Sequence, residues 1–447
     1  MIKIYDTMTR SLRDFVPLTE NVVNMYVCGP TVYNYIHIGN ARSTVAFDTI
    51  RRYFEYRGYT VNYISNFTDV DDKIIKAANE AGISTKELSD KFIAAFMEDT
   101  AQLGIKPATQ NPRVINYMDE IIAFVSTLVD KGFAYVSEGD VYFRVAKSKN
   151  YAKLANKTLE DLEIGASGRT DAETARKENP LDFALWKAAK EGEISWDSPW
   201  GPGRPGWHIE CSVMATEILG DTIDIHGGGA DLEFPHHTNE IAQSEAKTGK
   251  TFANYWMHNG FVNVDNEKMS KSLGNFVTVH DMLKTVDGQV LRFFLATQQY
   301  RKPINFTEKA IHDAEVNLKY LKNTHSLPLT GQVDQAELQT YLDAFQEAMD
   351  DDFNTANGVT VLFDMAKWIN SGHYDQTVKA AFEKMLQVFG IVFEEEVLDE
   401  DIEKLIEERQ AARANKDFAT ADRIRDELAA QGIKLLDTKD GVRWTRD

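Results

Sequence analysis

The sequence predicts an α/β protein built on a doubly wound parallel sheet, and three observations near its start predict this class. Residues 22–28, VVNMYVC, form an apolar run typical of a buried strand. Apolar residues then recur at helical spacing up to Gly58, which ends the predicted helix; they are Phe47, Ile50 and Phe54. Thr60–Ile64 is a second strand. A strand, a turn, a helix and a further strand in this order open a Rossmann-like nucleotide-binding sheet.

The parallel sheet is expected to be split in sequence. Residues from about 68 to 200 mix helical patterns with polar and Gly-rich stretches, and the next strand signal comes only at Thr222–His226. We therefore expect an insertion between the two halves of the sheet, within a first domain at 1–300.

The rest of the chain is predicted to be helical and to end in a small separate domain. After Phe276 the pattern is helical almost to the end, with a polar linker at Ser326–Gln335 and an acidic run at Glu394–Glu403. These breaks divide the second half into an α-helical domain at 301–395 and a C-terminal domain at 401–447.

Within the C-terminal domain the pattern predicts a helix followed by a β-hairpin. One face of the helix carries Phe418, Ala421, Ile424 and Leu428. The helix stops at Gly432 and the hairpin turns at Asp440-Gly441. The apolar positions of the hairpin are Ile433, Leu435, Val442 and Trp444.

Composition limits the classes of function. The 447 residues contain no apolar run long enough for a signal peptide or a membrane span, so we expect a soluble, cytoplasmic protein. A net charge of -20 argues against sequence-blind binding to nucleic acid, because phosphate is repelled by an acidic field. Residues 401–447 hold 11 acidic and 10 basic side chains, a net charge of -1, so a polyanion meets the least repulsion there.

A turn between strand and helix carries residues suited to phosphate. The run from Cys28 to Asn40 leaves the first strand and enters the helix, where free backbone N–H groups and the positive helix end face a ligand. Gly39 allows a ligand to approach the backbone closely. A second polar stretch, Lys268-Met269-Ser270-Lys271-Ser272, places two lysines on one short loop, suited to charge that develops on a departing phosphate. Alone, either stretch is equally compatible with an ordinary turn or a solvated basic loop.

Together the two stretches resemble the signature motifs of class I aminoacyl-tRNA synthetases. The first motif departs from the usual pattern, because Asn40 replaces a second histidine. Asparagine donates a hydrogen bond to an oxyanion but carries no positive charge, so its own role is left open.

The only two cysteines lie beside other possible metal ligands. Cys28 and Cys211 would suit a disulfide by number alone, but inert buried thiols are commoner in a reducing compartment. If a helix begins after Pro235, His236 and Glu240 project from one face of it. Two thiols, an imidazole and a carboxylate form a zinc set, although His236 and Glu240 alone would also suit a surface ion pair.

These stretches closely resemble those that carry zinc in the cysteinyl-tRNA synthetase family, where the ligands fall on Cys28, Cys211, His236 and Glu240. The resemblance covers essentially the whole chain and implies one Zn²⁺ per chain, with L-cysteine, ATP and tRNA(Cys) as substrates. Zinc would distinguish cysteine from serine, because pocket shape alone gives only about 10- to 200-fold selectivity. Metal coordination deprotonates a thiol outright, so no editing domain is needed.

The resemblance also implies roles for further residues. The catalytic set is His37, Asn40, Lys268 and Lys271, with Mg²⁺ accompanying ATP. The ATP-binding set is Gly29, Gly39, Asp231 and Lys271. Thr68 and Trp207 would line the cysteine pocket, although Trp207 would also suit core packing. In the C-terminal, anticodon-binding domain, Trp444 would stack on a base while Arg423 and Asp437 contact base edges; alternatively, Trp444 closes the small terminal core.

Two rival functions are weighed against a tRNA ligase. A related ligase joins cysteine to an amino sugar in mycothiol synthesis and shares the catalytic half, but the anticodon-type tail argues against it. A non-catalytic cysteine or tRNA sensor would have no reason to keep both lysines of the Lys268–Ser272 stretch. The family suggests a monomer.

Overall fold

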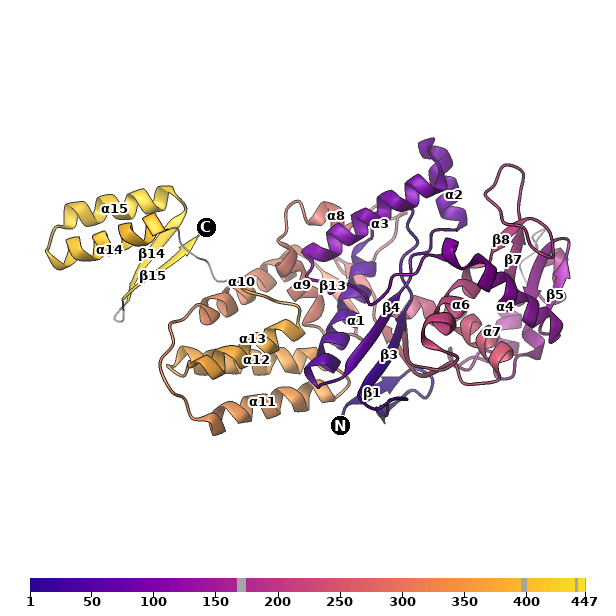
Figure 1. Ribbon diagram of the computed structural model, residues 1–447, viewed down its shortest axis with the longest axis horizontal. Helices are drawn as coiled ribbons and strands as arrows, with labels where there is room; N and C mark the ends of the chain where they lie inside the picture. Colours follow the sequence, from indigo (N-terminus) through magenta and orange to yellow (C-terminus); the bar gives the residue numbers. More distant parts are fainter. Residues whose placement is uncertain (167–173, 395–399, 439–440, 447) are drawn as a thin grey trace. The chain divides into compact units, whose positions relative to one another are not determined.

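The computed structural model describes residues 1–166, 174–394, 400–438 and 441–446. The chain forms two compact units, Met1–Val392 and Phe393–Asp447, which are described separately. Figure 1 shows the elements of both, coloured along the chain.

The first unit is built on a four-stranded parallel sheet in the order β10-β9-β3-β4. The strands are β3 (Val22–Val27), β4 (Thr60–Ser65), β9 (Ile223–Gly229) and β10 (Ala253–Asn259). The strand predicted near Thr222–His226 therefore exists and runs on to Gly229. β4 and β9 are far apart in sequence yet flank the same strand, so the predicted split of the sheet is confirmed.

Helix α1 (Ile38–Tyr56) connects β3 to β4. Phe47, Ile50 and Phe54 are buried on it, as their spacing predicts. Gly58 follows the helix with a φ of 88°, a left-handed conformation that favours glycine, and so ends the helix as expected. Helices α6 (Trp207–Leu219) and α7 (Thr238–Thr248) pack against each other in the second half of the fold.

The insertion between β4 and α6 has its own helices and its own sheet. Its helices are α2 (Asp72–Ala81), α3 (Thr85–Gln102), α4 (Met118–Asp130) and α5 (Leu159–Ala166). Its antiparallel sheet contains β5 (Ala134–Ser137), β6 (Asp140–Phe143), β7 (Phe183–Ala188) and β8 (Gly203–Pro205), in that order. Short 3-10 turns lie at Val114–Tyr117, Val145–Lys147 and Thr174–Arg176. The limits of 68 and 200 stay a prediction.

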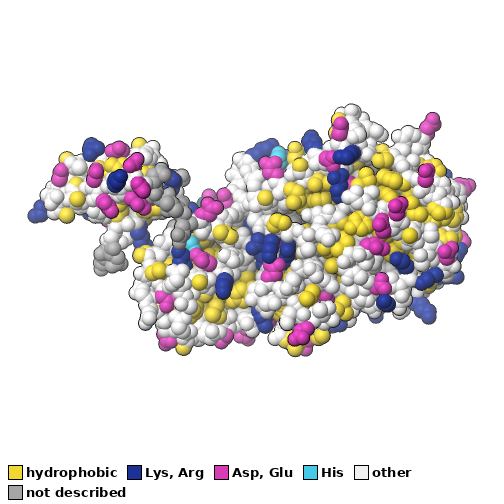
Figure 2. Space-filling model, viewed as in Figure 1, with side chains coloured by type: hydrophobic (Ala, Val, Ile, Leu, Met, Phe, Trp, Pro, Cys, Tyr) yellow, Lys and Arg dark blue, Asp and Glu magenta, His cyan; other side chains and the backbone are white. Residues whose placement is uncertain are grey.

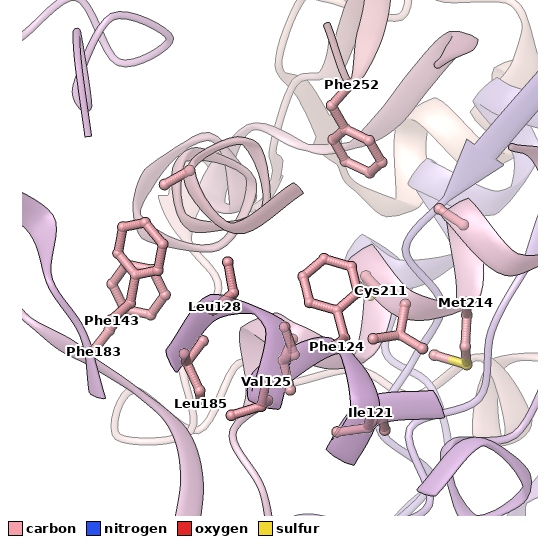
Figure 3. Close-up of a cluster of buried hydrophobic side chains, with 14 of the residues drawn as sticks. Ile121, Phe124, Val125, Leu128, Phe143, Phe183, Leu185, Cys211, Met214 and Phe252 are labelled. Atoms are coloured by element: carbon pink, nitrogen blue, oxygen red, sulfur yellow. The ribbon is translucent and has the colours of Figure 1, made fainter. Parts of the chain in front are cut away.

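The insertion is packed onto the helix that carries one of the two cysteines. Figure 3 shows Ile121 and Phe124 of α4 beside Cys211 and Met214 of α6, within one buried hydrophobic cluster. Burial of a phenylalanine or leucine side chain contributes about 1.5–3 kcal/mol. The insertion therefore helps to fix the position of α6.

Smaller elements complete the first unit around the sheet. They are β1 (Lys3–Asp6), β2 (Ser11–Asp14), the 3-10 turn η4 (Ala230–Leu232), the π turn η5 (Glu233–His237), β11 (Val262–Val264), β12 (Glu267–Lys268), α8 (Val279–Met282), α9 (Gly288–Ala296) and β13 (Ile304–Phe306). β13 interrupts the region predicted to be helical after Phe276, because it pairs in parallel with β11. A strand of three residues is too short to show the alternation of apolar and polar residues by which a strand is predicted.

A helical part follows in the same compact unit. Its helices are α10 (Glu308–His325), α11 (Gln335–Asp350), α12 (Thr355–Asn370) and α13 (Gln376–Val388). Of the predicted linker at Ser326–Gln335, residues 326–334 lie between α10 and α11, and Gln335 is the first residue of α11. Buried Arg292 of α9 joins this part to α1, since its Nε donates to Phe389 O at 2.8 Å and its Nη1 lies 2.6 Å from the carboxylate of Asp48.

The second unit contains two helices and a hairpin. They are α14 (Glu400–Ala414), α15 (Phe418–Ala430), β14 (Ile433–Thr438) and β15 (Gly441–Arg446). Ile424 and Leu428 are buried on α15 as predicted, whereas Phe418 is exposed because it occupies the first position of the helix. Of the predicted hairpin turn, Asp440 lies outside the described residues, as do residues 395–399 of the predicted acidic run.

Figure 2 shows side chains of both charge signs on the face of the first unit, with one group of Lys and Arg side chains near its middle. Within the described ranges, none of the helices combines the length and the apolar character that crossing a membrane requires.

Candidate active site and metal centre

Several of the residues predicted for the metal and the substrates lie at the carboxyl ends of the parallel strands, together with Asn66, which was not predicted. Cys28 directly follows β3, Asn66 and Thr68 follow β4, and Asp231 follows β9. In a doubly wound sheet this edge is where ligands bind, since the loops and helix N-termini open there.

Four donor atoms from distant segments meet at this edge. Cys28, Cys211, His236 and Glu240 each offer one ligand atom, and these atoms all lie within 4.8 Å of one another. The two sulfurs are 3.6 Å apart, and His236 Nε2 is 3.0 Å from Glu240 Oε1. His236 lies in η5 rather than in the predicted helix, but its pairing with Glu240 four residues later is the expected one. Two sulfurs, an imidazole and a carboxylate fit the ligand preferences of zinc.

The four donors shift one another's pKa values. The hydrogen bond from Cys28 lowers the pKa of the Cys211 thiol to about 6, although burial opposes this. Burial and the neighbouring Cys211 raise the pKa of Cys28. Burial lowers the pKa of His236, but the attraction of Glu240 outweighs it and raises that pKa to about 10. Protonated His236 thus balances part of the negative charge of Cys211 and Glu240, and a bound cation would take over this role as the ligands lose their protons.

Further histidines, for which no sequence motif predicts a role, surround these donors. His226 Nε2 contacts Glu240 Oε2 at 2.6 Å, and His208 Nδ1 contacts His236 Nδ1 at 3.0 Å. His237 Nε2 lies 3.4 Å from the Cys28 sulfur. These contacts fix the orientation of the ligand side chains, as outer partners do in metal sites. Glycine-rich spacing after His226 was the only signal near these residues.

A chain of hydrogen bonds continues from this cluster to the N-terminal segment. His237 Nδ1 is 2.7 Å from His258 Nε2, and His258 Nδ1 is 2.7 Å from Thr7 Oγ1. Burial lowers the pKa of His258 to about 3 and also lowers that of His237, so both rings are neutral. Each neutral ring has one donor and one acceptor nitrogen. The tautomer of one histidine therefore fixes the tautomer of the next histidine in this series of hydrogen bonds.

A second group of four donors overlaps the first. Cys28, His226, His237 and Glu240 also meet within 4.8 Å. This group has one thiol instead of two, and its two histidines are already engaged with Glu240 and His258. The group with both cysteines therefore suits zinc better.

The first signature motif caps helix α1. The His37 side chain accepts the Asn40 N–H at 3.1 Å, and Asn40 Oδ1 accepts the His37 N–H at 3.2 Å, which forms a capping box. This gives Asn40 a structural task that uses its carbonyl oxygen. Burial lowers the pKa of His37, with Asp231 opposing this and Lys271 adding to it, so His37 is neutral near pH 7.

Glycines let two backbone segments approach closely at the same edge. A Cβ on Gly29 would lie 1.7 Å from the carbonyl oxygen of Asn66, and one on Gly39 would lie 2.9 Å from the His37 ring. Any side chain at these positions would displace its neighbours. Asp231 lies in η4, and its charge acts on His37.

The second signature motif lies over the first. Lys271 Nζ is 5.3 Å from the ring centres of both Tyr33 and Phe276, and the ring of Phe276 meets His37 edge-on at 5.3 Å. Lys268 ends β12, with its Nζ 5.8 Å from the ring of Phe261. Both lysine side chains are exposed.

The residues predicted for the cysteine pocket border the four donors. Thr68 is buried, accepts a hydrogen bond from Asn66 Nδ2 at 3.1 Å and donates one to Glu210 at 3.5 Å. The Trp207 ring stacks on His236 with centroids 4.2 Å apart, and it remains 39% exposed. Trp207 is thus partly accessible rather than buried in the core, and its place in the cysteine pocket stays a prediction.

The residues predicted to contact tRNA all lie in the second unit. Asp437 accepts two hydrogen bonds of 2.9 Å from Arg409 and pairs with Arg413, so its carboxylate is already engaged. Arg423 is exposed and pairs with Glu427 on the same helix. Trp444 is half-buried against the small core of this unit, which leaves part of the ring accessible.

Comparisons with known proteins agree along the whole chain. Residues 14–316 match the family model of the class I (C) tRNA synthetase catalytic domain, residues 344–394 match the DALR domain, and residues 395–444 match the cysteinyl-tRNA ligase anticodon binding domain. A cysteine–tRNA ligase of Streptococcus thermophilus is 95% identical over 447 residues, covering all of both chains. One of Streptococcus pyogenes is 84% identical over the same full length.

A solved structure shares the fold at low sequence identity. The methionyl-tRNA synthetase of Mycobacterium tuberculosis in complex with methionyl-adenylate has a TM-score of 0.60 and 16% identity, covering 82% of this chain and 88% of that one.

Proposed function

Because the chain belongs to the cysteine–tRNA ligase family of class I aminoacyl-tRNA synthetases, we propose that it joins L-cysteine to the 3′ end of tRNA(Cys) at the expense of ATP. In the first step the cysteine carboxylate attacks the α-phosphate of ATP, which forms cysteinyl-adenylate and releases pyrophosphate. In the second, the terminal ribose hydroxyl of tRNA takes the cysteinyl group and AMP leaves. No side-chain nucleophile is needed, so the protein acts by positioning and by charge.

The observation that carries this proposal is the convergence of four donors at the nucleotide edge of the sheet. Cys28, Cys211, His236 and Glu240 would hold one zinc ion. When bound, zinc takes a thiol as its thiolate, which the neutral hydroxyl of serine cannot match. His226 orients Glu240 through the contact of 2.6 Å, and the insertion holds Cys211 in place.

Two residues are proposed to hold the rest of the amino acid. Thr68 donates its only hydroxyl proton to Glu210 and accepts from Asn66, so one lone pair is left for the ammonium group of the substrate. Trp207, stacked on His236, would close the pocket and exclude water from the reacting carboxylate.

The nucleotide is proposed to lie against the N-terminus of α1. Gly29, Gly39 and Asp231 would be among its contacts, with free backbone N–H groups facing the phosphates. Neutral His37 and the free amide NH₂ of Asn40 would donate hydrogen bonds to the phosphates. Lys268 and Lys271 would follow the charge that develops on pyrophosphate, and Mg²⁺ would accompany ATP.

The second unit is proposed to bind the anticodon of tRNA(Cys). Trp444 would stack on a base through the exposed part of its ring, and Arg423 would contact a base edge. Asp437 would first have to share its carboxylate with the arginines that hold it. We further propose that the protein acts as a monomer in the cytoplasm.

The rival functions receive less support. The match of residues 395–444 to an anticodon binding domain favours tRNA over an amino sugar as the acceptor. Both lysines of the second motif are present and exposed, which favours catalysis over sensing.

One assay separates the three functions. Exchange of labelled pyrophosphate into ATP should depend on cysteine, and addition of tRNA(Cys) should give cysteinyl-tRNA. Exchange without transfer to tRNA would favour the mycothiol-type ligase, and absence of exchange would favour a sensor.

A further inference from the structure

The segment that follows the lysine loop is tied to the segment that opens α1. Ile38 N donates to Val277 O at 3.1 Å, and Val279 N donates to Ile36 O at 3.0 Å. At its other end the loop begins at Lys268, where β12 pairs with β11. Between these anchors the exposed part that contains Lys271 forms a turn, in which Gly274 N donates to Lys271 O at 3.2 Å and the Asn275 side chain accepts from Ser270 N at 2.8 Å. Its position therefore depends on how firmly the exit of the loop is held.

One histidine at the exit joins three elements. The His280 ring of α8 stacks on Tyr35, with centroids 4.1 Å apart and planes at 11°. Its Nδ1 lies 3.1 Å from Oδ1 of Asp99 on α3. Tyr35 in turn meets Phe92 of α3 edge-on at 5.1 Å. Tyr35 lies two residues before His37, so the contacts link the lysine loop, the first motif and the insertion.

The contact with Asp99 holds the His280 ring in its position. Its side chain is 3% exposed, and burial raises its pKa. Its Oδ2 is buried without a hydrogen-bond partner within the described part of the chain. A buried carboxylate that lost His280 would lose the donor that satisfies it, so the ring is held at one position.

We propose that His280 is a positioning residue for the first chemical step, which holds the exit of the lysine loop so that Lys271 stays over the nucleotide site. The inference rests on the proposed function, and it assigns His280 no contact with a substrate. The path from His280 to Lys271 is short. Tyr35 is two residues from Tyr33, whose ring lies under the Lys271 ammonium, and Phe276, the other ring beneath that ammonium, is four residues before His280. Loss of the contacts of His280 with Tyr35 and Asp99 would let the loop adopt positions in which Lys271 does not reach the leaving phosphate.

Three substitutions separate the two contacts of His280 in the full-length, zinc-replete protein. His280→Leu removes both contacts, and His280→Phe keeps the stack but not the contact with Asp99. His280→Arg keeps both, because a guanidinium is planar, stacks on an aromatic ring and pairs with a carboxylate. His312→Leu is the matched control, since His312 is an exposed histidine on α10.

The first readout is cysteine-dependent pyrophosphate exchange. In His280→Leu, kcat should fall by about 10- to 100-fold, the scale of a displacement of about 1 Å, while KM for cysteine stays within about twofold. His280→Arg should restore kcat to within about threefold of the original protein, and His312→Leu should leave it unchanged. A fall in kcat that His280→Arg does not restore would overturn the inference.

The second readout is tryptic cleavage after Lys268 and Lys271, followed by mass spectrometry on the folded protein. His280→Leu should be cleaved several-fold faster there, and His280→Arg at the original rate. Equal cleavage rates in all variants would overturn the inference. If His280→Leu fails to fold, His280→Phe replaces it in the test. Because this variant loses the contact with Asp99, its kcat should fall and its cleavage should be faster, and no change in either would overturn the inference. If the original protein shows no cysteine-dependent exchange, the proposed function fails, and the cleavage rates still decide whether His280 holds the loop.

Discussion

Replacing Glu240 by glutamine tests the metal centre with a change of charge and almost none of shape. Glu240 is fully buried, and its carboxylate meets His226 at 2.6 Å, His236 at 3.0 Å and the Cys28 sulfur at 3.3 Å. The histidines outweigh burial and lower its pKa to about 2, so it is ionised at every working pH. Glu240→Gln therefore removes one full negative charge from the cluster.

The expected loss follows from the contacts that depend on this charge. The contact of Glu240 with His226 exists without metal and cancels in the binding equilibrium, so the loss comes from the contact with the metal. Loss of an outer partner of a metal ligand already costs about 10- to 100-fold in metal affinity. Because Glu240 is proposed as a ligand itself, the zinc dissociation constant should rise by about 100-fold or more, which is at least about 2.7 kcal/mol.

Competition with a zinc-binding dye measures this constant, and the same helix offers a control. Glu245 lies on α7, accepts a hydrogen bond from Phe252 N and is not one of the four donors. Glu245→Gln should bind zinc as the original protein does. A change of less than threefold in Glu240→Gln, or equal weakening in both variants, would exclude Glu240 as a zinc ligand.

Four further changes test other parts of the molecule. Cys211→Ser should lose bound zinc by elemental analysis together with the preference for cysteine over serine; retention of both would exclude Cys211 as a ligand. Lys271→Ala should lower kcat of pyrophosphate exchange by about 10²-fold or more with little change in KM for ATP, and an effect on KM alone would contradict this. A chain that ends before Asp401 should form cysteinyl-adenylate at nearly the full rate but charge tRNA poorly. Unchanged charging of tRNA by this shorter chain would show that the second unit is not needed. Arg292→Leu should lower the free energy of unfolding by about 3–5 kcal/mol, measured by urea denaturation, because Asp48 loses a buried partner.

Local patterns in the sequence predict the parallel sheet, whereas the four candidate ligands follow from the resemblance to a family together with the residue types present. The strand at 22–28 and the stop at Gly58 are visible because burial and φ restrict which residues can stand there. The pairing of His236 with Glu240 follows from their spacing alone. The two cysteines are the only ones in the chain, so few alternatives existed.

Contacts between distant segments could not be predicted in the same way. His226, His237 and His258 come from separate elements, and nothing in their spacing shows that they share one cluster. The engagement of Asp437 by Arg409 depends on how α14 packs on the hairpin. His280 has an ordinary position in the sequence, and its role emerges only when α3, α8 and the first motif are placed together.

We propose that Cys28, Cys211, His236 and Glu240 hold a zinc ion that receives the thiolate of the substrate. X-ray absorption at the zinc edge counts sulfur ligands directly, because zinc–sulfur distances of about 2.3 Å stand apart from zinc–nitrogen and zinc–oxygen distances of about 2.0–2.2 Å. We expect two sulfur ligands in the free protein, three after addition of cysteine, and two after addition of serine. A sulfur count that stays at two with saturating cysteine would contradict it.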